Sequence, residues 1–199
     1  MNHLGFAKVS ALALLALWPA RADELPPAPA NPNPPMLGFF DGAKALCAAR
    51  SYDAAHLKAH PQQKVTGIAF AYEPFERVAG EAEPQPMWDQ YAGTGAVFAR
   101  IVVVFRDDPR AALGAADCRA GTDAATLRCG IEGDGGGFTV TKRPDGRYRI
   151  DNPQGFSVEY PTADPDEPND GYRYVAARDD QASFLLDASA GGLCDTRWE

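Results

Sequence analysis

The sequence predicts a mainly β protein, an antiparallel small barrel or sandwich with one or two short helices. Several short segments alternate large apolar residues with small or polar ones, which is the pattern of strands. Turns rich in Gly, Pro and Asp divide these segments, and helical periodicity is weak. Short strands joined in this way are typical of antiparallel barrels and sandwiches. The pattern is compatible with both architectures.

Residues 1–22 have the features of a cleaved export signal. Lys8 supplies a positive charge, residues 9–18 are an apolar run, and Ala20-Arg21-Ala22 is a small-x-small cleavage site. A membrane-spanning helix needs about 20 apolar residues, so we expect removal of this segment and no remaining membrane anchor. No cysteine follows the cleavage site directly, where a bacterial lipoprotein would carry its lipid. The mature protein is therefore predicted to be soluble and periplasmic or secreted, where disulfides persist.

Residues 23–35 contain six prolines and predict a stiff, extended tether. A single β-rich domain is expected over residues 36–199. Residues 41–49 fit either a short helix or an entering strand, and their alanines favour helix. Residues 51–60 predict a brief helix with Ser51 as the N-cap and Pro61 ending it.

The strands are expected further along the chain. Residues 65–72 place large side chains on one face and mostly small ones on the other, which suits a strand packed on both sides. Residues 96–106 contain the β-branched run 101–104, which predicts a central buried strand. Asp108-Pro109 matches the start of a short helix. Residues 138–151 predict a hairpin, because Pro144-Asp145-Gly146 fits a type I turn with Gly in the left-handed region. Later strands are expected at 156–160, 171–176 and 182–186.

The charge balance restricts the possible partners. The formal net charge is −8, and loss of Lys8 and Arg21 with the signal makes it about −10. Nucleic acid and anionic lipid are not expected as partners, because both are bound largely through Lys and Arg. A cationic envelope or foreign protein, or a metal cation, fits the charge better. Solubility after export explains the same charge without any partner.

Four cysteines, an even number, predict two disulfides in an exported chain, with three possible pairings. We favour Cys118–Cys129, which closes a short Gly-containing loop, and Cys47–Cys194, which joins the start of the domain to its end. Zinc is the alternative, but no pair has the Cys-x2–4-Cys spacing of a structural zinc site.

A candidate metal site lies in the predicted helix 51–60. His56 and His60 are four residues apart and Asp53 is three before His56, so all three can share one helix face. The zincin motif needs Glu after its first histidine, and Leu57 occupies that position, so protease chemistry is not supported. The alternative is a polar helix face, with His60 near the end where the helix dipole favours a cation.

Other segments that invite a functional interpretation lack essential parts. The acidic loop 161–170 can be aligned with a calcium loop, but Pro168 and Ala177 then occupy ligand positions, which favours a solvated loop. The glycine-rich residues 132–137 lack the Lys-Ser/Thr of a phosphate loop, so their glycines are expected to permit positive φ. No Gly-x-Ser-x-Gly elbow is present. None of these motifs requires a cofactor.

Residues 51–66 (SYDAAHLKAHPQQKVT) and 134–138 (DGGGF) resemble a group of small exported bacterial proteins described as uncharacterised. The resemblance implies an exported, cysteine-bearing domain and no particular activity. We therefore expect a soluble periplasmic, non-catalytic binding or interaction protein of unknown ligand. The alternatives are a metal-handling protein that uses Asp53, His56 and His60, and an envelope hydrolase that uses a pair of carboxylates.

Overall fold

The computed structural model describes residues 39–40, 45–72, 75–76, 85–86, 96–161, 171–178, 181–189 and 192–196. The predicted signal peptide 1–22, the predicted tether 23–35 and most of the acidic loop 161–170 lie outside these residues. In the described part of the chain, no helix has the length and apolar character needed to cross a membrane.

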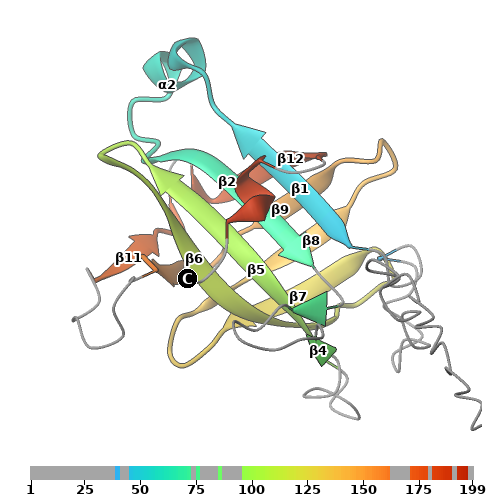
Figure 1. The fold of residues 1–199 in the computed structure, drawn as a ribbon. Coiled ribbons are helices and arrows are strands. Elements are labelled where there is room, and N and C mark those ends of the chain that lie inside the picture. Colours follow the sequence, from blue (N-terminus) through green and yellow to red (C-terminus); the bar gives the residue numbers. More distant parts are fainter. Residues whose placement is uncertain are drawn as a thin grey trace, which may run out of the picture.

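Eight antiparallel strands form a sheet that closes on itself, so the predicted mainly β fold is confirmed and the architecture is a barrel (Figure 1). The order is β6-β5-β2-β1-β12-β9-β8-β7, and β7 pairs with β6 to close the ring. The barrel strands are β1 (Leu46–Ser51), β2 (Val65–Tyr72), β5 (Ala96–Phe105), β6 (Asp108–Ala120), β7 (Thr126–Ile131), β8 (Gly137–Lys142), β9 (Tyr148–Asp151) and β12 (Ser183–Ala188).

Strand β6 has two partners along one edge. Its second half pairs with β7, and Leu113 in its first half pairs with Glu159 of β10. A hairpin of β10 and β11 thus extends the wall beside the barrel, as Figure 1 shows at the left.

The remaining elements are β10 (Phe156–Glu159), β11 (Tyr172–Val175), the short pair β3 (Phe75–Glu76) and β4 (Gln85–Pro86), helix α2 (Ala54–Ala59) and the 3-10 helix η3 (Gly192–Asp195).

The inside of the barrel is a hydrophobic core to which all eight strands contribute. Phe70, Phe156 and Phe184 are fully buried. The Phe138 ring lies 5.2 Å from that of Phe156 and 6.3 Å from that of Phe70, between centroids. Burial of such side chains is the main favourable term in folding, roughly 1.5–3 kcal/mol for each large one.

The outer face of β2 is also buried, as its alternation of large and small residues predicts. Ala69 and Ala71 point away from the barrel core and pack with Cys194 of η3. The Cys47–Cys194 disulfide joins η3 to β1, and the guanidinium of Arg100 donates to the Cys194 carbonyl at 3.0 Å. Small side chains on this face let η3 approach the sheet closely.

Three local predictions need correction. Residues 46–49 belong to strand β1, which is the entering-strand alternative, and the rest of segment 41–49 lies largely outside the described residues. The helix begins later than expected, because Asp53 and not Ser51 is its N-cap. Asp108-Pro109 begins strand β6 instead of a helix.

The strand at Asp108 has a physical reason. Residues 106–107 form a tight turn after which Phe105 pairs with Asp108, and Val104 pairs with Ala111. Pro109 therefore lies in an irregularity of the ladder, where its missing N–H breaks no regular strand bond. The Asp108 carboxylate accepts from the Arg110 N–H at 3.0 Å, a local turn contact that competes with helix capping.

The β8–β9 hairpin confirms its prediction. The Gly146 N–H donates to the Arg143 carbonyl at 3.0 Å, and Gly146 has φ 81°. Both predicted disulfides are present as well. Cys118 and Cys129 are direct cross-strand partners on β6 and β7, and Cys47–Cys194 spans 147 residues.

We predict that the long disulfide contributes more to stability than the short one. In the loop-entropy model, closing a loop of this length stabilises by about 4–5 kcal/mol and closing the short loop by about 3 kcal/mol. Urea denaturation of Cys47→Ala/Cys194→Ala and Cys118→Ala/Cys129→Ala should show the larger loss for the first variant. A larger loss for the second variant would show that barrel closure, and not loop length, dominates.

Gly136 provides a second stability test. It has φ 79°, and a β-carbon there would overlap the Gly155 carbonyl oxygen across the isolated bridge to β10. Gly136→Ala should therefore lower the free energy of unfolding by about 1–3 kcal/mol. Gly130→Ala is the matched control, because nothing lies within 4 Å of its added methyl group. Equal effects of the two changes in thermal unfolding would contradict this account.

Candidate functional site

Helix α2 stands at the top of the barrel, in the connection between β1 and β2 (Figure 1). The Asp53 carboxylate accepts from the His56 N–H at 2.7 Å and caps the first turn. At the other end, the guanidinium of Arg106 donates to the Leu57 and His60 carbonyls at 3.0 and 3.2 Å. This cation satisfies carbonyls that a helix end leaves open and complements the dipole there. The short helix is therefore held at both ends.

Three rings form a stack along the helix. The Tyr52 ring lies 4.6 Å from the His56 ring at an interplanar angle of 27°. The His60 ring lies 4.3 Å from the His56 ring on the same stack, at 20°. The Arg50 guanidinium carbon lies 5.7 Å from the centroid of the Tyr52 ring. The end of β1 and the helix thus present one continuous wall of flat side chains.

Gln63 fixes the orientation and the proton of His56. Gln63 is buried, and its amide nitrogen donates to the Val65 carbonyl at 2.7 Å, so its amide oxygen faces the histidine. The His56 Nε2 atom lies 3.1 Å from that oxygen. Because an amide oxygen only accepts, Nε2 carries the hydrogen, and Nδ1 is the nitrogen without a proton in the neutral ring.

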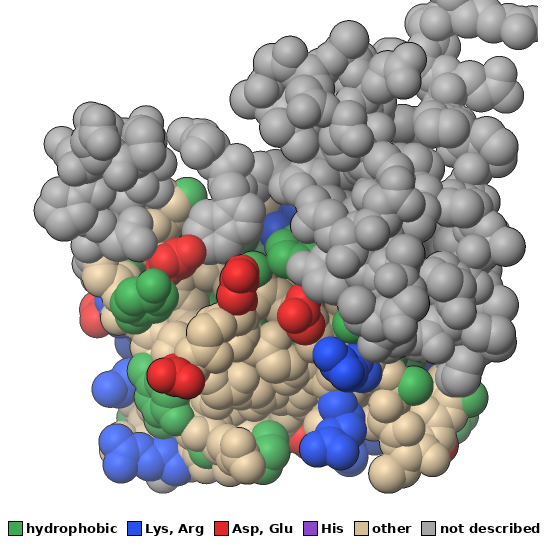
Figure 2. Space-filling model, turned by 90° about the horizontal axis from the view of Figure 1, so that it is seen from below, with side chains coloured by type: hydrophobic (Ala, Val, Ile, Leu, Met, Phe, Trp, Pro, Cys, Tyr) green, Lys and Arg blue, Asp and Glu red, His purple; other side chains and the backbone are tan. Residues whose placement is uncertain are grey.

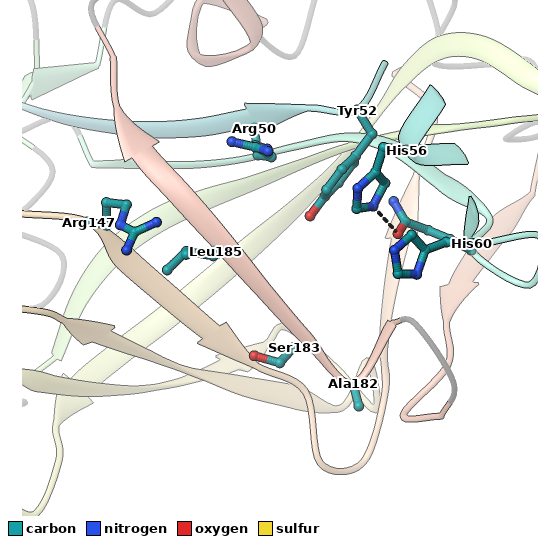
Figure 3. A pocket seen from close by; sticks show the side chains of 9 residues that line it. Arg50, Tyr52, His56, His60, Arg147, Ala182, Ser183 and Leu185 are labelled. Atoms are coloured by element: carbon teal, nitrogen blue, oxygen red, sulfur yellow. Dashed lines mark hydrogen bonds between the residues drawn. The ribbon is translucent and has the colours of Figure 1, made fainter. Parts of the chain in front are cut away.

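A groove lies between this wall and the outer surface of the barrel, with a cavity volume of about 440 Å³. Figure 3 shows Arg50 beside Tyr52 on one side of strand β12 and Arg147 on the other side, with His56 and His60 farther along the helix. Ser183 and Leu185 of β12 form the floor, since their neighbours Phe184 and Leu186 point into the core. The lining residues are Arg50, Tyr52, His56, His60, Gln63, Arg147, Ala182, Ser183 and Leu185.

Ion pairs orient both arginines. Arg50 Nη1 lies 3.2 Å from the Asp187 carboxylate, and Arg147 Nη2 lies 2.7 Å from that of Asp145. Hydrogen bonds from Arg147 hold the pKa of Asp145 at about 2, so this carboxyl is ionised at neutral pH. Burial raises the pKa of Tyr52, partly opposed by Arg50. The Tyr52 phenol therefore keeps its proton and offers a hydrogen-bond donor.

The three residues predicted from sequence to bind a metal lie close together, but in this structure they cap the helix and stack on one another. One Asp53 oxygen accepts from the helix backbone, and the imidazoles of His56 and His60 lie face to face. Among the described residues, no group of three or more His, Cys, Asp or Glu side chains is arranged to hold a metal ion. Asp53, His56 and His60 as a ligand set stay a prediction. Arg50, Tyr52, Gln63, Arg147 and Ser183 were not identified from sequence as site residues.

A second, smaller hollow of about 270 Å³ lies where β6 divides between β7 and β10. Glu132, Glu159 and the exposed ring of Tyr172 line it. Figure 2 views the molecule from below, the end opposite α2, and shows several acidic side chains near the middle of the described surface, with Lys and Arg side chains around them. The two hollows differ in charge, since the first has arginines and no carboxylate among its lining residues.

The hydrogen bond from His56 to Gln63 yields a direct prediction. In the wild type at a pH where His56 is neutral, ¹⁵N NMR of the imidazole should show the proton on Nε2. Gln63→Leu should weaken this preference and lower the free energy of unfolding by about 1–3 kcal/mol, because the Val65 carbonyl loses a buried donor. Gln62→Leu, at the exposed neighbouring position, is the control and should change neither the position of the His56 proton nor the free energy of unfolding. A wild-type proton on Nδ1 would contradict the assignment.

Comparison of the chain with protein-family models, with curated proteins and with solved structures gives no match in any of the three. The resemblance to small exported bacterial proteins therefore stays a prediction. Function has to be argued from the geometry of the barrel and its groove.

Proposed function

We propose that this chain is an exported, non-catalytic binding protein whose ligand site is the groove between helix α2 and the outer wall of the barrel. The observation that carries the proposal is the groove itself, a hollow of about 440 Å³ with polar and flat side chains along its sides. Small-molecule sites typically measure roughly 300–1,000 Å³ and combine apolar surface with a few polar groups. The groove fits this description.

The surface position of the site follows from the packing of the barrel. Larger barrels and lipocalin-type barrels hold ligands inside, but here aromatic side chains such as Phe70 and Phe184 occupy the interior. Removing them to admit a ligand would cost about 3–5 kcal/mol for each aromatic residue. Binding on the outside leaves this core intact.

The polar groups of the groove favour recognition over catalysis. Tyr52 keeps its proton because burial raises its pKa, so it donates a hydrogen bond instead of acting as a base. The His56 ring is fixed by Gln63 on one nitrogen and by stacking on both faces. Rigid, oriented side chains lower the entropy that binding costs.

The compartment is part of the proposal. Disulfides form and persist in oxidising surroundings, and both pairs of cysteines are joined. Together with the leader features of residues 1–22, this supports export to the periplasm or beyond. The cationic protein partner expected from the net charge would meet carboxylates such as Glu132 and Glu159 at the second hollow, and not the arginine-lined groove.

The proposal predicts that filling the groove abolishes ligand retention. Mature protein should be incubated with the small-molecule fraction of an envelope extract and examined by native mass spectrometry. Wild type should retain a low-mass adduct, and Ser183→Trp should lose it, because the indole fills the floor of the groove. Ser157→Trp places the same side chain in the second hollow and serves as the matched control.

Three other results would change the conclusion. An adduct that survives Ser183→Trp but disappears in Ser157→Trp would move the site to the second hollow. An adduct with the mass of a metal ion, lost in His56→Ala, would support the metal-handling alternative. A chemically altered small molecule released from the protein would contradict a non-catalytic role.

A further inference from the structure

The charge of the groove contrasts with that of the chain. The protein carries a net charge of −8, yet the groove is lined by two arginines, two histidines and no carboxylate. The adjoining hairpin segment 142–151 contains four basic and two acidic residues, a local net charge of +2. Figure 3 places Arg50 and Arg147 on opposite sides of strand β12, and the Asp187 carboxylate, 3.2 Å from Arg50, also interacts electrostatically with Arg147.

Both guanidinium groups keep donors available for a ligand. A guanidinium has five N–H donors. Arg50 donates to Asp187 through Nη1, and Arg147 donates to Asp145 through Nε and Nη2. These pairs are exposed, with about half of each side chain accessible, so each contributes little to stability. The carboxylates therefore orient the guanidinium groups and leave further N–H groups for an incoming oxyanion.

The α2 end of the groove suits a flat, weakly polar body. The Tyr52–His56–His60 stack forms one wall, and Leu185 with Ala182 supplies apolar floor. Aromatic rings pack favourably in offset or edge-on contact with such a wall. Tyr52 and Ser183 add hydroxyl groups between the two ends.

We infer that the groove binds a small organic oxyanion, a carboxylate or phosphate attached to a ring, with the oxyanion between Arg50 and Arg147 and the ring toward the Tyr52 wall. This inference rests on the proposed function and specifies its ligand class. Arginine binds both oxyanions through paired N–H donors, so the two share one recognition chemistry.

Isothermal titration calorimetry of the mature protein with phenyl phosphate, benzoate and benzyl alcohol tests the inference. Both anions should bind and the neutral alcohol should not, and the tighter anion identifies the oxyanion. Arg50→Gln and Arg147→Gln should each weaken anion binding about tenfold or more, since hydrogen bonds to charged groups contribute roughly 1.5–3 kcal/mol. Arg128→Gln, an exposed arginine on β7, makes the same charge change away from the groove and should leave affinity unchanged.

The outcomes separate this inference from the proposed function. Thermal unfolding of each variant should match wild type closely, so a lost affinity reports the site. Binding of benzyl alcohol as tight as that of the anions would overturn the anion assignment while leaving a ligand groove in place. Anion binding that persists in both groove variants, or falls equally in Arg128→Gln, would overturn it as well. Ser183→Trp with undiminished binding of phenyl phosphate would place the anion outside the groove and count against the proposed site itself.

Discussion

The pairing of β7 with β6 closes the sheet, and the rest of the molecule depends on this closure. Cys118 and Cys129 are direct partners in that ladder and are covalently joined. Once the ring is closed, every second side chain of each strand points inward, and the sequence supplies apolar residues at most of those positions. In the described part of the chain these side chains form the barrel core, and the groove beside α2 lies outside it.

Closure also decides where the groove lies. Strand β1 pairs with β12, and β12 with β9, which places the end of β1 and the hairpin that carries Arg147 on opposite sides of β12. The connection from β1 to β2 then rises above the rim as α2, held by Asp53 and Arg106. The lining residues of the groove come from segments up to 135 residues apart in the chain, from Arg50 to Leu185. Only the folded ring brings them together.

Because the groove forms only when the barrel closes, local sequence patterns could predict parts of the fold but not the site. Local signals sufficed for β2, whose two faces differ in side-chain size, for the hairpin around Gly146, and for both disulfides. Strand β7 was missed, although its buried Leu127 and Cys129 alternate with exposed Arg128 and Gly130, because the segment was interpreted as a loop closed by Cys118–Cys129. The start of β6 was misread because Asp-Pro resembles a helix start. Of the groove's lining residues, the sequence indicated only His56 and His60, and as metal ligands. The arginines of the groove look like ordinary surface charges until β12 lies between them.

An acidic chain with a site for anions involves no contradiction. Screening limits the field of exposed charges to about 8 Å at physiological ionic strength, so distant carboxylates act weakly on a bound ligand. The interaction energy of a bound ligand comes mainly from the groups that contact it. In the groove these groups are guanidinium, imidazole and hydroxyl groups. The net charge instead acts on larger partners, which meet many surface groups at once, and it favours cationic ones. The proposed anion site beside α2 and the expected cationic protein partner are therefore compatible on one molecule.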